Sequence, residues 1–303
     1  EASTTYSETN DITLYAQWIA RTDTAYTVQY YLMDTNGTTY TMETPVTTEH
    51  GTTDTTANAT ITSFTGFTYD SLNANNVTSG TILGDGSLIL KVYYSRNQYT
   101  VTFKDYDDSV LKTEYVLYQN DATAPADPSR TGYTFTGWDK TFTGVTANMT
   151  VNAQYTAIEY VIGFDAQDGE VTPATKTVIY DQQVGTLPTP TKAGYDFDGW
   201  NTASDGTGDT YTSATYYTVA GGTTLYAIWT NHVYTITLDA QSGVVTPSTY
   251  DVTYLDVVGT LPTPTRDGYD FGGWNTASNG TGDYYEASTT YSETNDITLY
   301  AQW

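Results

Sequence analysis

Apolar and polar residues alternate in short runs along most of this chain, and two kinds of run recur. Runs of the first kind open at Tyr26, Tyr99, Tyr160 and Tyr234, and runs of the second kind close at Tyr94, Tyr155, Trp229 and Trp303. Alternation with a period of two turns one face of a strand to a core and the other to water. No window shows a sustained helical period. We therefore predict a mainly β protein with little helix.

A glycine- and aromatic-rich motif lies between the two kinds of run. It reads GYTFTGW at 132–138, GYDFDGW at 194–200 and GYDFGGW at 268–274, and a degraded copy starts at Gly66. Tyrosine and phenylalanine two positions apart share one face of a strand. The tryptophan comes three positions later, and the glycine before it could form a bulge that restores the face. We expect each motif to deliver one aromatic cluster to one small core.

The spacing of these markers divides the chain into repeated units. Residues 1–18 recur letter for letter as residues 286–303, and the two copies begin 285 residues apart. We therefore expect the chain to be a slice of a longer array that opens on the closing strands of a preceding repeat, 1–18. Four units follow at 22–97, 98–157, 158–230 and 231–303. A search for such repeats takes precedence over a domain count from length.

Composition narrows the function further. The chain has no cysteine, so disulfides and thiolate metal sites are impossible. Its formal net charge of −25 opposes binding to nucleic acid and to anionic lipid. Threonine supplies about a fifth of the residues and 30 are tyrosine, both of which favour pleated surfaces. No apolar run reaches the length of a membrane span.

The ordered motifs resemble known bacterial families. The second unit, from Tyr99 to Tyr155, is similar to the B-repeat of internalin-type surface proteins. The third and fourth resemble the Listeria–Bacteroides repeat in their LPTPT, GYDF-GW and LYA-W segments. The first unit is similar to mucin-binding-protein-type repeats. The resemblance implies a β-grasp-like (ubiquitin-like) fold in each unit, a place in long secreted cell-surface proteins, and a spacer or adhesive role without catalytic residues.

Candidate chemistry is sparse. His50 and His232 stand apart from any catalytic or metal-ligand motif, and we predict no catalytic, cofactor or metal site. The acidic loops Asp205–Asp209 and Asp165–Glu170 offer oxygen ligands of the kind that Ca²⁺ prefers. In the fourth unit, however, Asn279 replaces Asp205 and Ser242 replaces Asp168. We expect solvated turns there, with calcium as the open alternative.

Tyrosines on predicted outer faces are the other candidates for binding. They are Tyr15, Tyr226 and Tyr300 on closing strands, and Tyr216, Tyr217, Tyr284 and Tyr285 beside loops. They can stiffen a wet sheet face by cross-strand pairing, or stack on sugars. Five Asn-x-Thr sequons, at Asn36, Asn58, Asn76, Asn148 and Asn279, occur about as often as this composition gives by chance.

We predict a non-enzymatic, extracellular cell-surface protein that acts as a stalk, spacer or fibre. Its partners are the neighbouring repeats of its own chain, without nucleic acid and without membrane insertion in this segment. Two alternatives stay open: an adhesin module that binds glycan or a host protein through tyrosine-rich faces, and a subunit of a multi-chain filament. The unpaired segment 1–18 motivates the filament, because its apolar face needs a cover.

Overall fold

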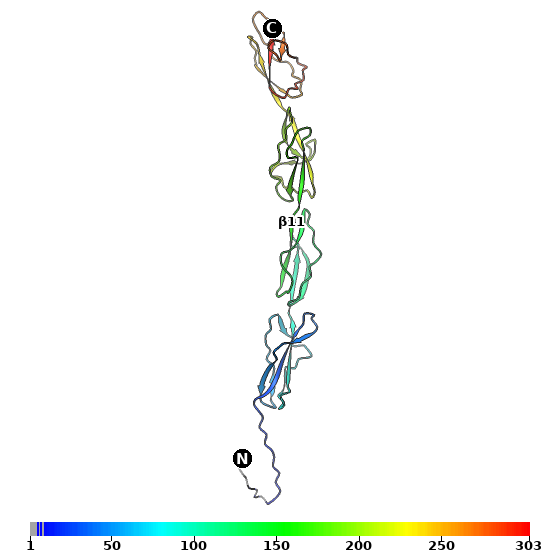
Figure 1. Cartoon of the computed structure of the whole chain (residues 1–303), viewed down its shortest axis with the longest axis vertical. Helices are drawn as coiled ribbons and strands as arrows, with labels where there is room; N and C mark the ends of the chain where they lie inside the picture. Colours follow the sequence, from blue (N-terminus) through cyan, green and yellow to red (C-terminus); the bar gives the residue numbers. More distant parts are fainter. Residues whose placement is uncertain (1–4, 6, 8) are drawn as a thin grey trace. The chain divides into compact units, whose positions relative to one another are not determined.

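The structure, a computed structural model, describes residues 5, 7 and 9–303. These residues form strands, turns and connecting loops, and none of them is helical. Four larger sheets follow one another along the chain, and each takes its strands from one continuous stretch of sequence (Figure 1). The mainly β class is therefore confirmed. We call the four sheets with their loops the first to fourth modules.

The first two modules differ in the number of their strands. The first module contains β1 (Thr24–Met33), β2 (Tyr40–Met42), β3 (Thr47–Gly51), β5 (Phe67–Tyr69) and β7 (Ile89–Arg96), with β4 (Thr56–Asn58) and β6 (Ser79–Thr81) as a separate pair. The second contains β8 (Gln98–Lys104), β9 (Val110–Leu117), β10 (Tyr133–Trp138) and β11 (Met149–Ala157) in the order β10-β11-β8-β9.

The third and fourth modules share one plan. The third contains β12 (Glu159–Asp165), β13 (Thr175–Ile179), β14 (Tyr195–Asn201), β15 (Thr210–Tyr211) and β16 (Thr223–Asn231), in the order β13-β12-β16-β14-β15. The fourth contains β17 (Val233–Asp239), β18 (Thr249–Thr253), β19 (Gly273–Asn275), β20 (Tyr284–Tyr285) and β21 (Ile297–Gln302), in the equivalent order.

The opening and closing strands of every module are parallel neighbours. β1 pairs with β7, β8 with β11, β12 with β16, and β17 with β21. Because each pair has a further strand on both sides, it lies inside its sheet. The alternating runs are thus confirmed as strands, and the parallel central pair agrees with a β-grasp-like plan. None of the described residues is helical, and connecting segments contribute side chains to the core instead.

Each module has its own hydrophobic cluster. In the third module Ile162, Val178 and Leu225 come from strands, whereas Val184 and Tyr217 come from the connecting segments. All five are buried. The other three clusters contain no residue of this one. Each module is therefore stabilised by burying its own apolar side chains. The unit boundaries that we drew from the sequence remain a prediction.

The glycine before the motif tryptophan does form a bulge. In β14 the register with β16 shifts between Phe197 and Gly199, and Gly199 has φ of 150°. The shift returns the Trp200 indole to the core, where it is 2% exposed and donates to the Pro188 carbonyl at 2.8 Å. The motif tyrosine behaves differently. Phe197 packs against the core cluster but Tyr195 does not, so our assignment of that tyrosine to the core is wrong.

Residues 9–23 precede the first module. Within the described part of 1–18 no strand forms, although the identical sequence at the other end of the chain yields β21. Leu14 and Trp18 are 85% and 91% exposed. The reason is pairing, because β21 is held by β17 and the described residues offer no opening strand to this copy. Residues 1–4, 6 and 8 of the expected closing strands lie outside the described residues.

Two buried phenols make the first module sensitive to alkali. Tyr26 donates to a Glu49 carboxylate oxygen at 2.6 Å, and this bond raises the pKa of Tyr26 to about 12. Burial raises the pKa of Tyr94 to about 12 as well. Because both values lie above the ordinary 10, the stability tied to the neutral phenols is complete below pH 10 and is lost as the pH rises towards 12.

We therefore expect the melting temperature to fall steeply above pH 10, and the Tyr26→Phe chain to lose less over the same range. Circular dichroism melts together with the ultraviolet absorbance of tyrosinate would measure both quantities. If all tyrosines ionise near pH 10 while the fold is retained, this account of the first module is wrong.

Candidate functional site: the joints between modules

Successive modules meet at joints built from the same backbone contacts. At each joint the carbonyl of a glycine accepts the N–H of a linker residue three positions after the closing aromatic. The carbonyl of that linker residue accepts the N–H of a tyrosine in the next module. The N···O distances of these bonds are 2.8–3.0 Å. The sets are Gly66, Asn97 and Tyr118; Gly132, Ile158 and Tyr180; and Gly194, His232 and Tyr254.

The tyrosine ring lies directly on the glycine. A Cβ on Gly66 would approach the Tyr118 ring to 2.1 Å, one on Gly132 the Tyr180 ring to 2.3 Å, and one on Gly194 the Tyr254 ring to 2.4 Å. Real Cβ contacts are never so short. All three glycines also have φ near +80°, a conformation that side chains disfavour. The joint therefore requires glycine for its backbone conformation and for the space that the ring occupies.

Further rings extend each joint on both sides. The aromatic residue after the glycine meets the joint tyrosine edge to face, with Tyr133–Tyr180 and Tyr195–Tyr254 centroids 5.6 and 5.5 Å apart. The joint tyrosine also contacts the tyrosine that opens its own module, as in Tyr160–Tyr180 at 6.4 Å. A cation lies over the ring of the residue after the glycine: Arg130 is 3.7 Å from the Tyr133 ring centroid. Such contacts contribute about 0.5–1.5 kcal/mol each beyond their burial.

We expect the tyrosine in these joints to control how strongly the linker amides are protected from hydrogen exchange. Tyr180→Ala removes the ring from Gly132 and Tyr133, and Tyr180 is not itself a member of the third module's core cluster. A loss of about 1–2 kcal/mol would speed hydrogen exchange at the Ile158 and Tyr180 amides roughly tenfold. Tyr180→Phe, which keeps the ring, is the matched control. Unchanged exchange in the alanine variant would show that the ring contributes nothing.

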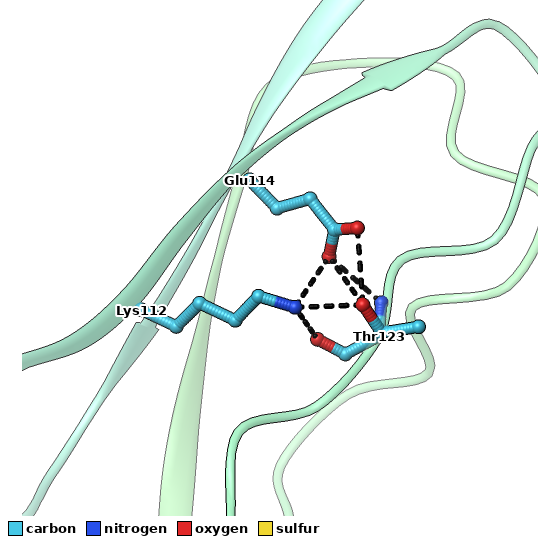
Figure 2. A network of polar contacts seen from close by, with 3 residues as sticks. All are labelled: Lys112, Glu114 and Thr123. Carbon is cyan, nitrogen blue, oxygen red and sulfur yellow. Dashed lines mark hydrogen bonds and ion pairs between the residues drawn. The ribbon is translucent and has the colours of Figure 1, made fainter.

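A closely connected polar network lies in the second module (Figure 2). Lys112 Nζ donates to Glu114 Oε2 at 3.0 Å and to the Thr123 carbonyl and hydroxyl oxygens at 2.6 Å each. The Thr123 N–H donates to the same carboxylate at 2.8 Å, and this bond is the main cause that lowers the pKa of Glu114. The stabilisation is present at neutral pH and weakens as the pH falls through that lowered value.

This network fixes the position of a loop. It ties the segment after β9 back onto the strand that carries Lys112 and Glu114 (Figure 2). The Lys112 ammonium thus donates to three acceptors in this network. Lys176 in the third module binds the equivalent loop through the Thr186 carbonyl. These lysines thus hold the loops in position.

The acidic loop at Asp205–Asp209 is organised from inside by an asparagine. Asn201 is 4% exposed, and its side chain bonds the Gly206 and Gly208 carbonyls and the Ala203 N–H. Asp205 uses one carboxylate oxygen on the Thr207 N–H and hydroxyl, and Asn279 does the same with Thr281. Among the described residues no three His, Asp or Glu side chains are close enough to share a metal ion. Calcium binding stays an untested alternative.

The histidines have different surroundings. His50 lies on β3 at the surface. His232 belongs to the third joint, where its Nδ1 lies 2.8 Å from the Asp196 carboxylate and its ring meets the Tyr234 ring at 4.6 Å. The sequence placed His232 in a linker but gave no sign of the Asp196 contact.

Some of the tyrosines that we assigned to outer faces are exposed and others are not. Tyr15, Tyr216 and Tyr284 are 82%, 58% and 51% exposed. Tyr217 is fully buried, and its hydroxyl donates to the Gly221 carbonyl. Beside the third sheet an open hollow of about 350 Å³ is lined by Gln167, Asp168, Lys192, Tyr195, Asp205 and Trp229, with three further residues. None of the described residues forms a helix that could cross a membrane.

Small β modules of one plan, joined by one recurring contact, define the class: a tandem-repeat protein. Comparison with known families agrees. The profile of the Listeria–Bacteroides repeat domain matches residues 99–158, 160–228 and 234–302. The chain therefore belongs to the Listeria–Bacteroides repeat family. The matched segments include the second module, for which we expected an internalin B-repeat, and leave out the first, whose resemblance to mucin-binding repeats remains a prediction.

Three relatives place this family among large proteins. A putative Gly-rich membrane protein and a putative membrane protein of Evansella cellulosilytica are 40% and 32% identical, over 37% and 79% of this chain. Internalin H of Listeria monocytogenes is 35% identical over 56% of it. The aligned parts cover 14%, 38% and 28% of those proteins. The chain is thus a repeat region related to internalin-type and membrane-associated proteins.

Proposed function

We propose that this chain is an extracellular structural segment, a stalk or spacer without catalytic activity, that transmits tension along a cell-surface protein. One observation carries the proposal: each module begins and ends on adjacent, parallel strands. Ile162 on β12 lies opposite Thr223 on β16, and Ile236 on β17 opposite Ile297 on β21. A pull on the chain therefore drags the two strands past each other. The bonds between them must break together, so the module resists extension.

The net charge and the joints between modules also support a role as a stalk. A net charge of −25 on 303 residues makes neighbouring chains repel each other and keeps the segment soluble. At each joint the glycine, the linker and the tyrosine carry tension from one module to the next through backbone hydrogen bonds. The relatives' descriptions as internalin and membrane proteins support a location at the cell surface.

Single-molecule extension tests this proposal. Handles at the two ends of the full chain should give separate unfolding peaks, each releasing roughly 200 Å as a module of about 70 residues extends. The matched control attaches handles at cysteines introduced at Glu159 and Ile179, which are paired antiparallel neighbours. Because that pull opens the bonds one at a time, its force should be much lower. Equal forces in the two geometries, or a featureless curve, would overturn the stalk.

A second candidate, glycan binding, is favoured by the hollow in the third module. Trp229 and Tyr195 offer rings, while Lys192, Gln167, Asp168 and Asp205 offer polar groups beside them. Sugars are bound by this combination of stacking and hydrogen bonds. A glycan array with the full chain and its Asp168→Ser/Asp205→Asn variant, which copies the fourth module, tests the idea. Selective binding lost in the variant supports it, and no binding excludes it.

A further inference from the structure

The end of the fourth module carries one half of a joint. Gly268 has φ of +81°, within a few degrees of the three joint glycines. Arg266 lies 4.0 Å from the Tyr269 ring centroid, as Arg130 and Lys192 lie over the equivalent rings. Among the described residues other than its chain neighbours, none has an atom within 4 Å of the place where a Cβ on Gly268 would stand. The backbone conformation and the cation of a joint are thus present at Gly268, with space for a ring.

The sequence that follows this surface in an array can be read from the chain itself. Residues 286–303 are identical to residues 1–18, and at the first occurrence the next residues are Ile19 to Asp23 and then β1. A copy of the first module would therefore follow the fourth. Its linker is longer. The closing aromatic and the opening tyrosine are five positions apart at Tyr94–Tyr99 and Trp229–Tyr234, but eight positions apart at Trp18–Tyr26.

The first module also has no tyrosine at the position that corresponds to the joint tyrosine. The joint tyrosines are bonded to the residue two positions before the opening tyrosine, which in the first module is Thr24. Thr24 lies opposite Gly51, and a Cβ on Gly51 would stand 2.5 Å from Ile82 Cδ1. Because Gly51 has no side chain, the first module presents no ring at this position. The neighbouring Thr53 already has partners, the Arg21 carbonyl just before the module and the Thr24 hydroxyl within it.

From these observations we propose that an array of this sequence contains two kinds of joint: three tight joints, closed by tyrosine on glycine, and one hinge, between the fourth module and the next first module. The hinge would recur every 285 residues. At the hinge the fourth module faces a partner with a linker three residues longer and a Gly-Thr-Thr edge at 51–53 in place of the ring. This inference refines the proposed stalk, because it predicts where the stalk bends.

Spin-label distances measure the two kinds of joint in one molecule. The chain has no cysteine, so labels can be placed freely on a tandem chain made of residues 1–303 followed by a second copy of residues 19–303. One pair, at Ala214 and Ser288, spans the third joint, and both positions are exposed. A second pair, at Ser288 and the second copy's Leu72, spans the hinge; Leu72 is 92% exposed.

The distance distribution across the hinge should be roughly two-fold wider than across the third joint. Tyr254→Ala should widen the distribution at the third joint and leave the hinge unchanged. Hydrogen exchange of the core strands confirms that the modules of this variant stay folded, and Tyr180→Ala repeats the comparison at the second joint should they not. Equal, narrow distributions in the parent chain would overturn the hinge without touching the stalk, whose test is the unfolding force.

Discussion

Trp274→Ala is expected to unfold most of the fourth module and to leave the third intact. The indole is 3% exposed, its N–H donates to the Pro262 carbonyl at 3.0 Å, and its ring meets Phe271 edge to face at 5.5 Å. Truncating a buried tryptophan costs about 3–5 kcal/mol. A module of some 70 residues has roughly 4–10 kcal/mol of stability in total. The variant therefore removes a large part of it.

Hydrogen exchange read peptide by peptide would show the effect. Protection should be lost across residues 231–303 and retained across 158–230, because no residue is shared between the two hydrophobic clusters. Trp200→Ala, at the equivalent place in the third module, should give the reverse pattern. Loss of protection in both modules from either variant would mean that the modules fold as one unit, contrary to the separate clusters.

Asn275→Ala is the second substitution with a large expected effect, although it lies at the edge of a surface loop. Asn275 is fully buried and uses both ends of its amide: Nδ2 donates to the Gly282 carbonyl at 2.9 Å, and Oδ1 accepts from the Ala277 N–H at 2.9 Å and the Gly282 N–H at 3.0 Å. Alanine leaves three backbone groups without a partner. We expect a loss of about 2–4 kcal/mol.

Urea unfolding followed by tryptophan fluorescence would measure this loss. Asn279→Asp in the same loop is the matched control, since the third module carries Asp205 there with the same two threonine bonds. The control should change stability by about 0.5 kcal/mol or less. If Asn275→Ala behaves like the control, water replaces the amide and the loop does not depend on it.

Most of the fold could be predicted from the sequence, because apolar and polar residues alternate with a period of two along the strands. The alternation from Tyr160 to Phe164 follows directly from one buried and one exposed face, and the glycine before Trp200 foretold the bulge. Period two assigns a residue to a face, but it does not say where along the strand the core ends. Tyr195 lies beyond that end, so it pairs with Tyr254 of the next module instead of entering the core.

The joints themselves were missed for a related reason. A contact between modules depends on residues far apart in sequence, and no local pattern marks it. A signal did exist: Tyr118, Tyr180 and Tyr254 follow the opening tyrosines of their modules by 19, 20 and 20 positions. Aromatic residues at constant intervals outside an alternating run mark a fixed contact of their own. The burial of Asn201 and Asn275 was equally hidden, because polar residues in a Gly-rich stretch are usually solvated.

The separation of the four hydrophobic clusters has a consequence for how such a gene can change. A recombination event that inserts or removes one complete 285-residue period leaves every interior and every tight contact as it was. The protein that results would be longer or shorter by one period and would contain one hinge more or fewer. Selection on the distance spanned can therefore act on copy number while the folding problem stays solved.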